Sequence, residues 1–461
     1  MKRRDFGLLA GTSLATAAAI RPAQAQPVTP DPTLLTTTLN PMGGERAGNA
    51  DGSIPAWTGG LVSAALSLDQ TIRVPLFTDE QPLYTVDASN MAQYAPLLTE
   101  GTKAQITKFG LSLNVYPTHR TAAAAQYMYD NTAKNVTRAK FDPRGGRFGF
   151  TGAVGGVAFP IIDTSDPLVG GAQVIWNHLT AWWGYYGQTM FTPGTVVIDG
   201  KQILVAGLMA REIYPYYDPN VTPETYDGYY SKGHYYYKAP GEVEGQEILV
   251  WHSTNVSVHP DMVWQLLNGQ GRVRKAPDEA YGTPSPTANG IANIDESSCF
   301  YGNPSQYNWT CIGKQEMLVP YNCNGLALTP VTEALGPHFP SPKATRWEKH
   351  RVWVVEANLA PGEHNVNLKR RFYVDEDSWY ALLGEGYDAQ MNLVKAYAIY
   401  NECLPSMPGT VESSTATYDL QTGNYAFNGN IIDPPWPPGQ FLGPQADTYF
   451  EAQEMAANAS F

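Results

Sequence analysis

The sequence predicts a mainly β protein built on an antiparallel sheet, and two observations support this prediction. Residues 351–379 have the alternation of a β-hairpin: apolar side chains occupy every second position over residues 353–359, and four apolar residues share one parity over residues 366–374. The chain of 461 residues also contains 28 Tyr, 11 Trp, 43 Gly and 36 Pro, a composition that favours strands and turns over long helices.

The alternation in this hairpin predicts one polar, half-solvated face and one apolar face. The residues that we expect on the apolar face are Trp353, Val355, Leu359, Leu368, Phe372 and Val374. An apolar face needs a cover, and the sequence leaves two candidates for it, a core helix or a bound hydrophobic molecule. The nature of this cover decides the function.

Residues 1–25 are typical of an export signal. A twin arginine at Arg3-Arg4 precedes an apolar run over residues 7–20, and Ala23-Gln24-Ala25 is a small-x-small cleavage site. The run is shorter than the roughly 20 residues of a membrane span. We therefore expect cleavage near Ala25 and a mature protein that works in a bacterial periplasm.

The charge of the chain is strongly acidic. It has 30 Lys+Arg and 43 Asp+Glu, a net charge of −13. Residues 1–25 hold four of the basic residues and one of the acidic ones, so the mature chain carries −16. Such a charge argues against nucleic acids and anionic membrane surfaces as partners.

We expect residues 26–461 to form a single domain that begins with an extended lead over residues 26–60, pinned by the ring of Trp57. Apolar residues at helical spacing predict a helix over residues 87–109, broken into two pieces by Pro96 and Gly101. The same spacing predicts helices in two further segments, over residues 122–135 and 172–187. Turn residues predict two more hairpins, around Asp199-Gly200 and Thr422-Gly423.

The cysteines are Cys299, Cys311, Cys323 and Cys403. An even number in an exported protein predicts disulfides, for which three pairings exist. We favour Cys299–Cys311 and Cys323–Cys403. The wide spacings do not fit a zinc site.

The motifs of the common catalytic classes are missing from the sequence. It has no Gly-x-Ser-x-Gly elbow, dinucleotide fingerprint, haem-attachment cysteine pair or three-ligand metal cluster. We therefore predict a protein that is not an enzyme, with no catalytic residue, metal or cofactor. The alternative is an enzyme acting on a lipid or glycan, whose centre would be His252, His259 and Asp261, which could meet across a bend.

The feature of the sequence that favours a binding protein is the aromatic content of the predicted strands. Aromatic residues on strands usually form core, but a concave sheet lined by them would also make an apolar cleft. The ligand-binding residues that we predict are Trp251, Trp264, Trp353, Val355, Leu368 and Phe372.

Several segments resemble, in order, one proteobacterial periplasmic family, domain of unknown function thirteen twenty-nine. These segments are residues 48–60, 98–109, 115–123, 159–179, 272–284, 307–322 and 352–379. That family is grouped with the lipoprotein-carrier fold of the LolA and LolB proteins.

The resemblance implies a single, strongly curved antiparallel sheet, an open half-barrel whose concave face is covered by helices. It also implies binding or carriage of a lipid, sterol or hydrocarbon, with an outer-membrane β-barrel and an inner-membrane exporter as partners. A third hypothesis is a non-catalytic interaction subunit of an outer-membrane transport complex, docking through its acidic surface.

Overall fold

The computed structural model describes residues 30–63, 73–144, 146–185, 188–269, 272–276, 281–429, 440–441 and 447–458. The predicted signal peptide, residues 1–25, lies outside the described residues, as do the first residues of the predicted lead. Within the described part of the chain, sixteen strands form one large sheet, and β3 (Lys140–Phe141) and β4 (Phe150–Thr151) form a separate pair.

The strands of the large sheet are β1 (Tyr84–Val86), β2 (Leu113–Val115), β5 (Gln188–Ile198), β6 (Lys201–Ile213), β7 (Tyr229–Ala239), β8 (Glu247–Ser253), β9 (Met262–Leu266), β10 (Arg274–Lys275), β11 (Tyr307–Pro320), β12 (Trp347–Leu359), β13 (Lys369–Asp375), β14 (Ala381–Tyr387), β15 (Leu393–Leu404), β16 (Gly409–Asp419), β17 (Tyr425–Gly429) and β18 (Gln440–Phe441).

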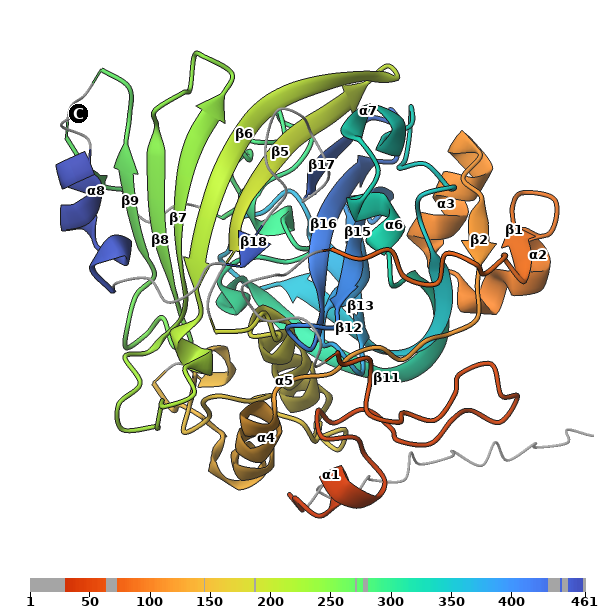
Figure 1. Ribbon diagram of the computed structural model, residues 1–461, viewed down its shortest axis with the longest axis horizontal. Coiled ribbons are helices and arrows are strands. Elements are labelled where there is room, and N and C mark those ends of the chain that lie inside the picture. Colours follow the sequence, from red (N-terminus) through yellow and green to blue (C-terminus); the bar gives the residue numbers. More distant parts are fainter. Residues whose placement is uncertain are drawn as a thin grey trace, which may run out of the picture.

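The sheet is open. Its strand order is β1-β2-β12-β13-β14-β15-β16-β17-β5-β6-β7-β8-β9-β10, with β11 on β12 and β18 on β5, and the two end strands are not paired with each other. All pairings between its strands are antiparallel except one parallel bridge between β2 and β12. Figure 1 shows the long strands bending, with β5 to β9 as one wing of the sheet. The predicted open, curved antiparallel sheet is confirmed.

The helices are few and short. They are α1 (Leu34–Thr37), α2 (Met91–Tyr94), α3 (Glu100–Phe109), α4 (Gln126–Arg138), α5 (Pro167–Leu179), α6 (Asn324–Ala327), α7 (Val331–Ala334) and α8 (Ala452–Asn458). Short 3-10 segments are η2 (Ala95–Leu97), η3 (Gly146–Phe148), η4 (Pro215–Tyr217), η5 (Ile294–Glu296), η6 (Pro304–Gln306) and η7 (Asp447–Phe450). In the described residues, no helix has the length and apolarity of a membrane span.

Local signals explain where the predicted helices begin and end. The helix predicted over residues 87–109 is interrupted near Pro96, which lies in η2, but Gly101 does not break it and lies inside α3. The helix α3 begins after Thr99, whose side chain accepts a hydrogen bond from the N–H of Thr102. The helix α3 ends at Phe109, and the Gly110 that follows it has a left-handed φ of 74°. The other two predicted helices correspond to α4 and α5, and α5 starts earlier than predicted, at Pro167, with Asp166 as its N-cap.

The hairpin of β12 and β13 has the predicted pairing, with Val355 opposite Phe372. The predicted half-solvated face is present at one end, where Glu356 and Arg371 are half-buried and Asn358 is exposed. At the other end Val354 is as buried as Val355, because other segments of the chain cover both faces there. One of them is the N-terminal lead, whose Ala47 carbonyl accepts a hydrogen bond from Arg351 Nη1 at 3.0 Å.

The lead is held in place by Trp57, as predicted. Its ring is buried, and its Nε1–H donates to the carbonyl of Ala122 at 3.0 Å. Arg46 lies over the same ring, with its guanidinium carbon 5.5 Å from the ring centroid. A large apolar ring therefore anchors a segment that has little regular structure of its own.

A buried ion-pair network follows the end of β13. Arg120 donates to Asp377 through Nε and Nη2, both at 2.7 Å, and Asn40 donates to the same carboxylate at 2.7 Å. The adjacent Glu376 accepts from Lys314 Nζ at 2.6 Å. These carboxylates are at most 2% exposed. The network therefore joins the lead, the loop that carries Arg120, and β11 at one point of the core.

All four cysteines are buried and have free thiols in the structure. The predicted pairs Cys299–Cys311 and Cys323–Cys403 are therefore not formed. Other groups occupy their surroundings: the Cys311 side chain packs against α5 at Gly170, and the Cys323 thiol donates to the carbonyl of Arg346 at 3.4 Å. Burial raises the pKa of Cys323 and Cys403 to about 12, which keeps both protonated.

We predict that Arg120→Ala lowers the free energy of unfolding by about 3–5 kcal/mol, because it leaves buried carboxylates without their counter-charge. Equilibrium urea unfolding measures the change. Lys103→Ala is the control, since its ion pair with Glu100 is solvent-exposed, and it should change stability by less than about 0.5 kcal/mol. A loss below about 1 kcal/mol for Arg120→Ala would contradict the role of this network.

We also predict that the protein purified without reductant has four reactive thiols per chain once it is denatured. The folded protein should react slowly, because all four thiols are buried and protonated. Titration with a thiol-reactive chromophore, with and without denaturant, checks this. Fewer than four thiols after denaturation would contradict this prediction and indicate that the protein contains disulfides.

Candidate ligand cavity

A cavity of about 910 Å³ lies against the wing of the sheet formed by β6 to β9. Other parts of the chain contribute to its lining, among them the end of α5 with the residues that follow it, β16, and the segment of residues 281–306. This volume is in the range of small-molecule sites, about 300–1,000 Å³. The cavity is therefore large enough to hold a ligand of lipid or sterol size.

The alternation of side chains along β8 decides which residues face the cavity. Ile248, Val250 and His252 line it, whereas Leu249 and Trp251 point to the opposite face of the sheet. There α8 and η7 cover them, and Trp251 Nε1 donates to the carbonyl of Phe450 at 2.8 Å. Figure 1 shows α8 at the outer side of this wing.

None of the six predicted ligand-binding residues lines this cavity. Trp251 and Trp264 pack on each other beneath α8, with ring centroids 5.1 Å apart. Trp353, Val355 and Phe372 belong to the main core. Leu368 is half-buried elsewhere on the sheet. Aromatic residues fill a protein core as well as a ligand site, so their density alone does not identify the lining.

Part of the lining is aliphatic. It includes Leu208 on β6, Ile248 on β8, and Val263 and Leu267 on and after β9, and all four are half-buried. By contrast, Leu249, on the covered face of β8, is fully buried. Apolar side chains from adjacent strands thus face open space on the cavity side and protein on the other side.

Another part of the lining contains half-buried carboxylates bonded to hydroxyls. Glu212 accepts from the hydroxyls of Tyr214 and Tyr235, both at 2.6 Å. Glu412 on β16 accepts from Ser298 Oγ at 2.9 Å. Burial raises the pKa of Glu412 to about 7, and the nearby charge of Glu212 adds to this effect.

The predicted alternative centre is only partly assembled. His252 and Asp261 both line the cavity, with Nδ1 of the histidine 3.6 Å from a carboxylate oxygen. His252 Nε2 is hydrogen-bonded to Tyr301, and Tyr281 donates to Asp261. His259 is not part of this group and packs on the ring of Tyr229, with centroids 6.0 Å apart. Both ring nitrogens of His252 therefore have protein partners.

Few of the residues that line the cavity could be identified from sequence patterns. Tyr235 and Tyr237 share the parity of Gly233 and Ser231 on β7, and all four line the cavity, so the alternation of the tyrosine-rich segment marks one face. No sequence pattern marked the two carboxylates as neighbours, because Glu212 on β6 and Glu412 on β16 are 200 positions apart.

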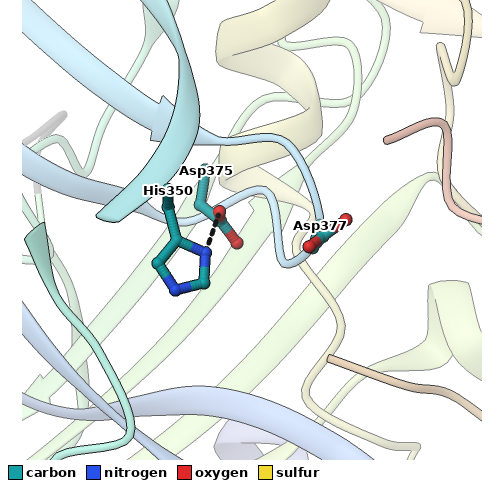
Figure 2. Close-up of side chains that lie close together, drawn as sticks. All are labelled: His350, Asp375 and Asp377. Carbon is teal, nitrogen blue, oxygen red and sulfur yellow. Dashed lines mark ion pairs between the residues drawn. The ribbon is translucent and has the colours of Figure 1, made fainter. Parts of the chain in front are cut away.

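A second cluster, outside the cavity, has the residue types of a metal site. His350, Asp375 and Asp377 place ligand atoms within 4.8 Å of one another in the buried network after β13, and Figure 2 shows the ion pair of His350 with Asp375. Asp377 is already occupied by Arg120 and Asn40. The guanidinium beside it would repel a divalent cation, so this donor set fits an ion-pair network rather than a metal site.

We predict that the stability of the protein falls as the pH rises from about 4.5 to about 7 through Glu412. The folded state holds the proton on this carboxyl up to about pH 7 and the unfolded state loses it near its ordinary pKa of 4.5, so the folded state binds more protons in this window. Glu412→Gln should therefore gain about 1–3 kcal/mol over wild type as the pH is raised through this window.

Urea unfolding at several pH values measures this difference. Glu244→Gln is the control, since Glu244 is exposed outside the cavity. A difference between wild type and Glu412→Gln that does not change with pH would contradict the prediction.

Solved structures with a similar fold include a DUF1329 family protein from Desulfovibrio piger, with 12% identity, a TM-score of 0.43, and coverage of 63% of this chain and 99% of that chain. A putative outer membrane lipoprotein-sorting protein domain from Vibrio parahaemolyticus has 13% identity, a TM-score of 0.42 and the same coverage.

Sequence comparison covers more of the chain. An uncharacterized protein of Pseudomonas aeruginosa, PA3922, is 32% identical over 406 residues, which are 85% of each chain. The model of the family described as protein of unknown function (DUF1329) matches residues 85–456. This chain therefore belongs to the DUF1329 family, as its sequence segments predicted.

Proposed function

We propose that this protein binds a hydrophobic molecule in the cavity beside β6 to β9 and carries it within the periplasm. The observation that supports this proposal is the half-buried aliphatic wall of Leu208, Ile248, Val250 and Val263. Apolar side chains that face open space lose the stabilisation that burial would give them, about 25 cal/mol per Å². A hydrophobic ligand would supply this burial.

The difference between the two faces of β8 and β9 supports a bound ligand as the cover of this aliphatic wall. On the outer face, α8 and η7 bury Leu249 and Leu266. On the inner face, Val250 and Val263 are half-buried and line a volume of about 910 Å³. The same strands thus have one face closed by protein and one face left for something else.

The site of action and the partners proposed for this carrier rest on the sequence and on the resemblance. The predicted export signal over residues 1–25 supports a periplasmic location. The resemblance supports an outer-membrane β-barrel and an inner-membrane exporter as partners, and a lipid, sterol or hydrocarbon as cargo.

Catalysis is not part of this proposal. The predicted centre is incomplete, because His259 lies apart from His252 and packs on the ring of Tyr229.

We predict that Val250→Trp weakens the binding of a neutral hydrophobic probe by at least about tenfold, because the larger ring fills the cavity. The probe is N-phenyl-1-naphthylamine, whose fluorescence rises in an apolar environment. Ile203→Trp is the matched control, since Ile203 is on β6 but is 46% exposed and outside the cavity.

Val263→Trp, on the neighbouring strand, gives a second test of the same wall, and the melting temperature of each variant reports whether it is folded. Folded Val250→Trp and Val263→Trp variants that bind the probe as well as wild type does would refute the proposed site.

A further inference from the structure

The charged residues that line the cavity are nearly all of one sign. Among the described residues, its lining contains four carboxylates, Glu212, Asp261, Glu363 and Glu412, and no lysine or arginine. The histidines are His178 and His252. Burial lowers the pKa of His178 to about 4, so this residue carries no charge near neutral pH.

Several buried carboxylates elsewhere in the fold have a fixed cation, although Glu385 is held by the N–H of Gly101 and the hydroxyl of Tyr387. Asp377 is paired with Arg120 at 2.7 Å, Glu296 with Lys395 at 2.6 Å, and Glu402 with Arg73 at 2.9 Å. Buried charges are normally paired in this way, because an isolated charge costs several kcal/mol to desolvate.

In the cavity, hydroxyl groups take the place of fixed cations. Glu212 is bonded to two tyrosine hydroxyls and Glu412 to one serine hydroxyl. Neutral donors orient a carboxylate but do not balance its charge. Glu212 and Glu412 therefore lack a fixed counter-charge from a lysine or arginine in the cavity lining.

Aromatic residues share this lining. The hydroxyls of Tyr214 and Tyr235 donate to Glu212, and Tyr301 and Tyr380 also line the cavity. The π faces of aromatic rings attract cations, and a combination of rings and carboxylates is a common way to bind an ammonium group.

We propose that the ligand of this cavity is a cationic amphiphile, whose ammonium group lies at Glu212 and Glu412 and whose apolar body lies against Leu208, Ile248 and Val263. This inference depends on the proposed function, because it assigns a chemical class to the molecule bound there. It also excludes anionic lipids such as fatty acids, since their headgroups would meet like charges without a lysine or arginine to bind them.

Three molecules that share one alkyl chain and differ in headgroup charge test this assignment: dodecylammonium, dodecanol and dodecanoate. Binding to the full mature protein is measured by isothermal titration calorimetry at about pH 8, below the critical micelle concentration of the two ionic molecules and the solubility limit of dodecanol. We expect dodecylammonium to bind at least about tenfold more tightly than dodecanol, and dodecanoate to bind most weakly.

A double variant, Glu212→Gln with Glu412→Gln, should remove the preference for dodecylammonium over dodecanol and leave the affinity for dodecanol within about threefold of wild type. Glu244→Gln, which removes an exposed carboxylate outside the cavity, should keep the preference.

The outcomes separate this inference from the proposed function. If the wild-type protein binds all three molecules alike, or dodecanoate most tightly, the cationic assignment is overturned while a hydrophobic site stands. If the protein binds none of the three, the proposed function fails together with the assignment. If the double variant keeps the preference, the two carboxylates are not its cause and the assignment is overturned.

Discussion

The guanidinium of Arg370 connects the core sheet to the segment that lines much of the cavity. Arg370 is fully buried on β13 and donates to a carboxylate oxygen of Asp295 at 3.0 Å and to the carbonyl of Cys299 at 2.5 Å. The rings of Phe372 and Tyr397 lie 5.1 and 4.9 Å from its guanidinium carbon. A charge buried so deeply is stable only when its partners stay in place, so the position of residues 281–306 depends on it.

With this segment fixed, the strands of the wing provide the rest of the cavity. Alternation along β8 sends Leu249 and Trp251 toward α8, and Ile248 and Val250 toward the open volume. Along the antiparallel strands, the lining changes from aliphatic at Leu208 to acidic at Glu212. The lining therefore combines apolar and acidic side chains, which is the pattern of a site for an amphipathic molecule.

The sequence predicted the features that depend on neighbouring residues. Asp199-Gly200 and Thr422-Gly423 form the turns of the β5–β6 and β16–β17 hairpins, and Thr99 and Gly110 limit α3. It did not predict the burial of Arg370 or the face to which Trp251 points, because both depend on segments distant in the chain. For the same reason, the cavity lining was misassigned to aromatic residues that pack in the core.

The central claim is that the cavity holds a hydrophobic molecule in the working protein. Native mass spectrometry of protein purified gently from the periplasm of its own host tests this most directly. The account predicts a species heavier than the mature polypeptide, which returns to the polypeptide mass after extraction with organic solvent. A single species at the polypeptide mass both before and after extraction would contradict it.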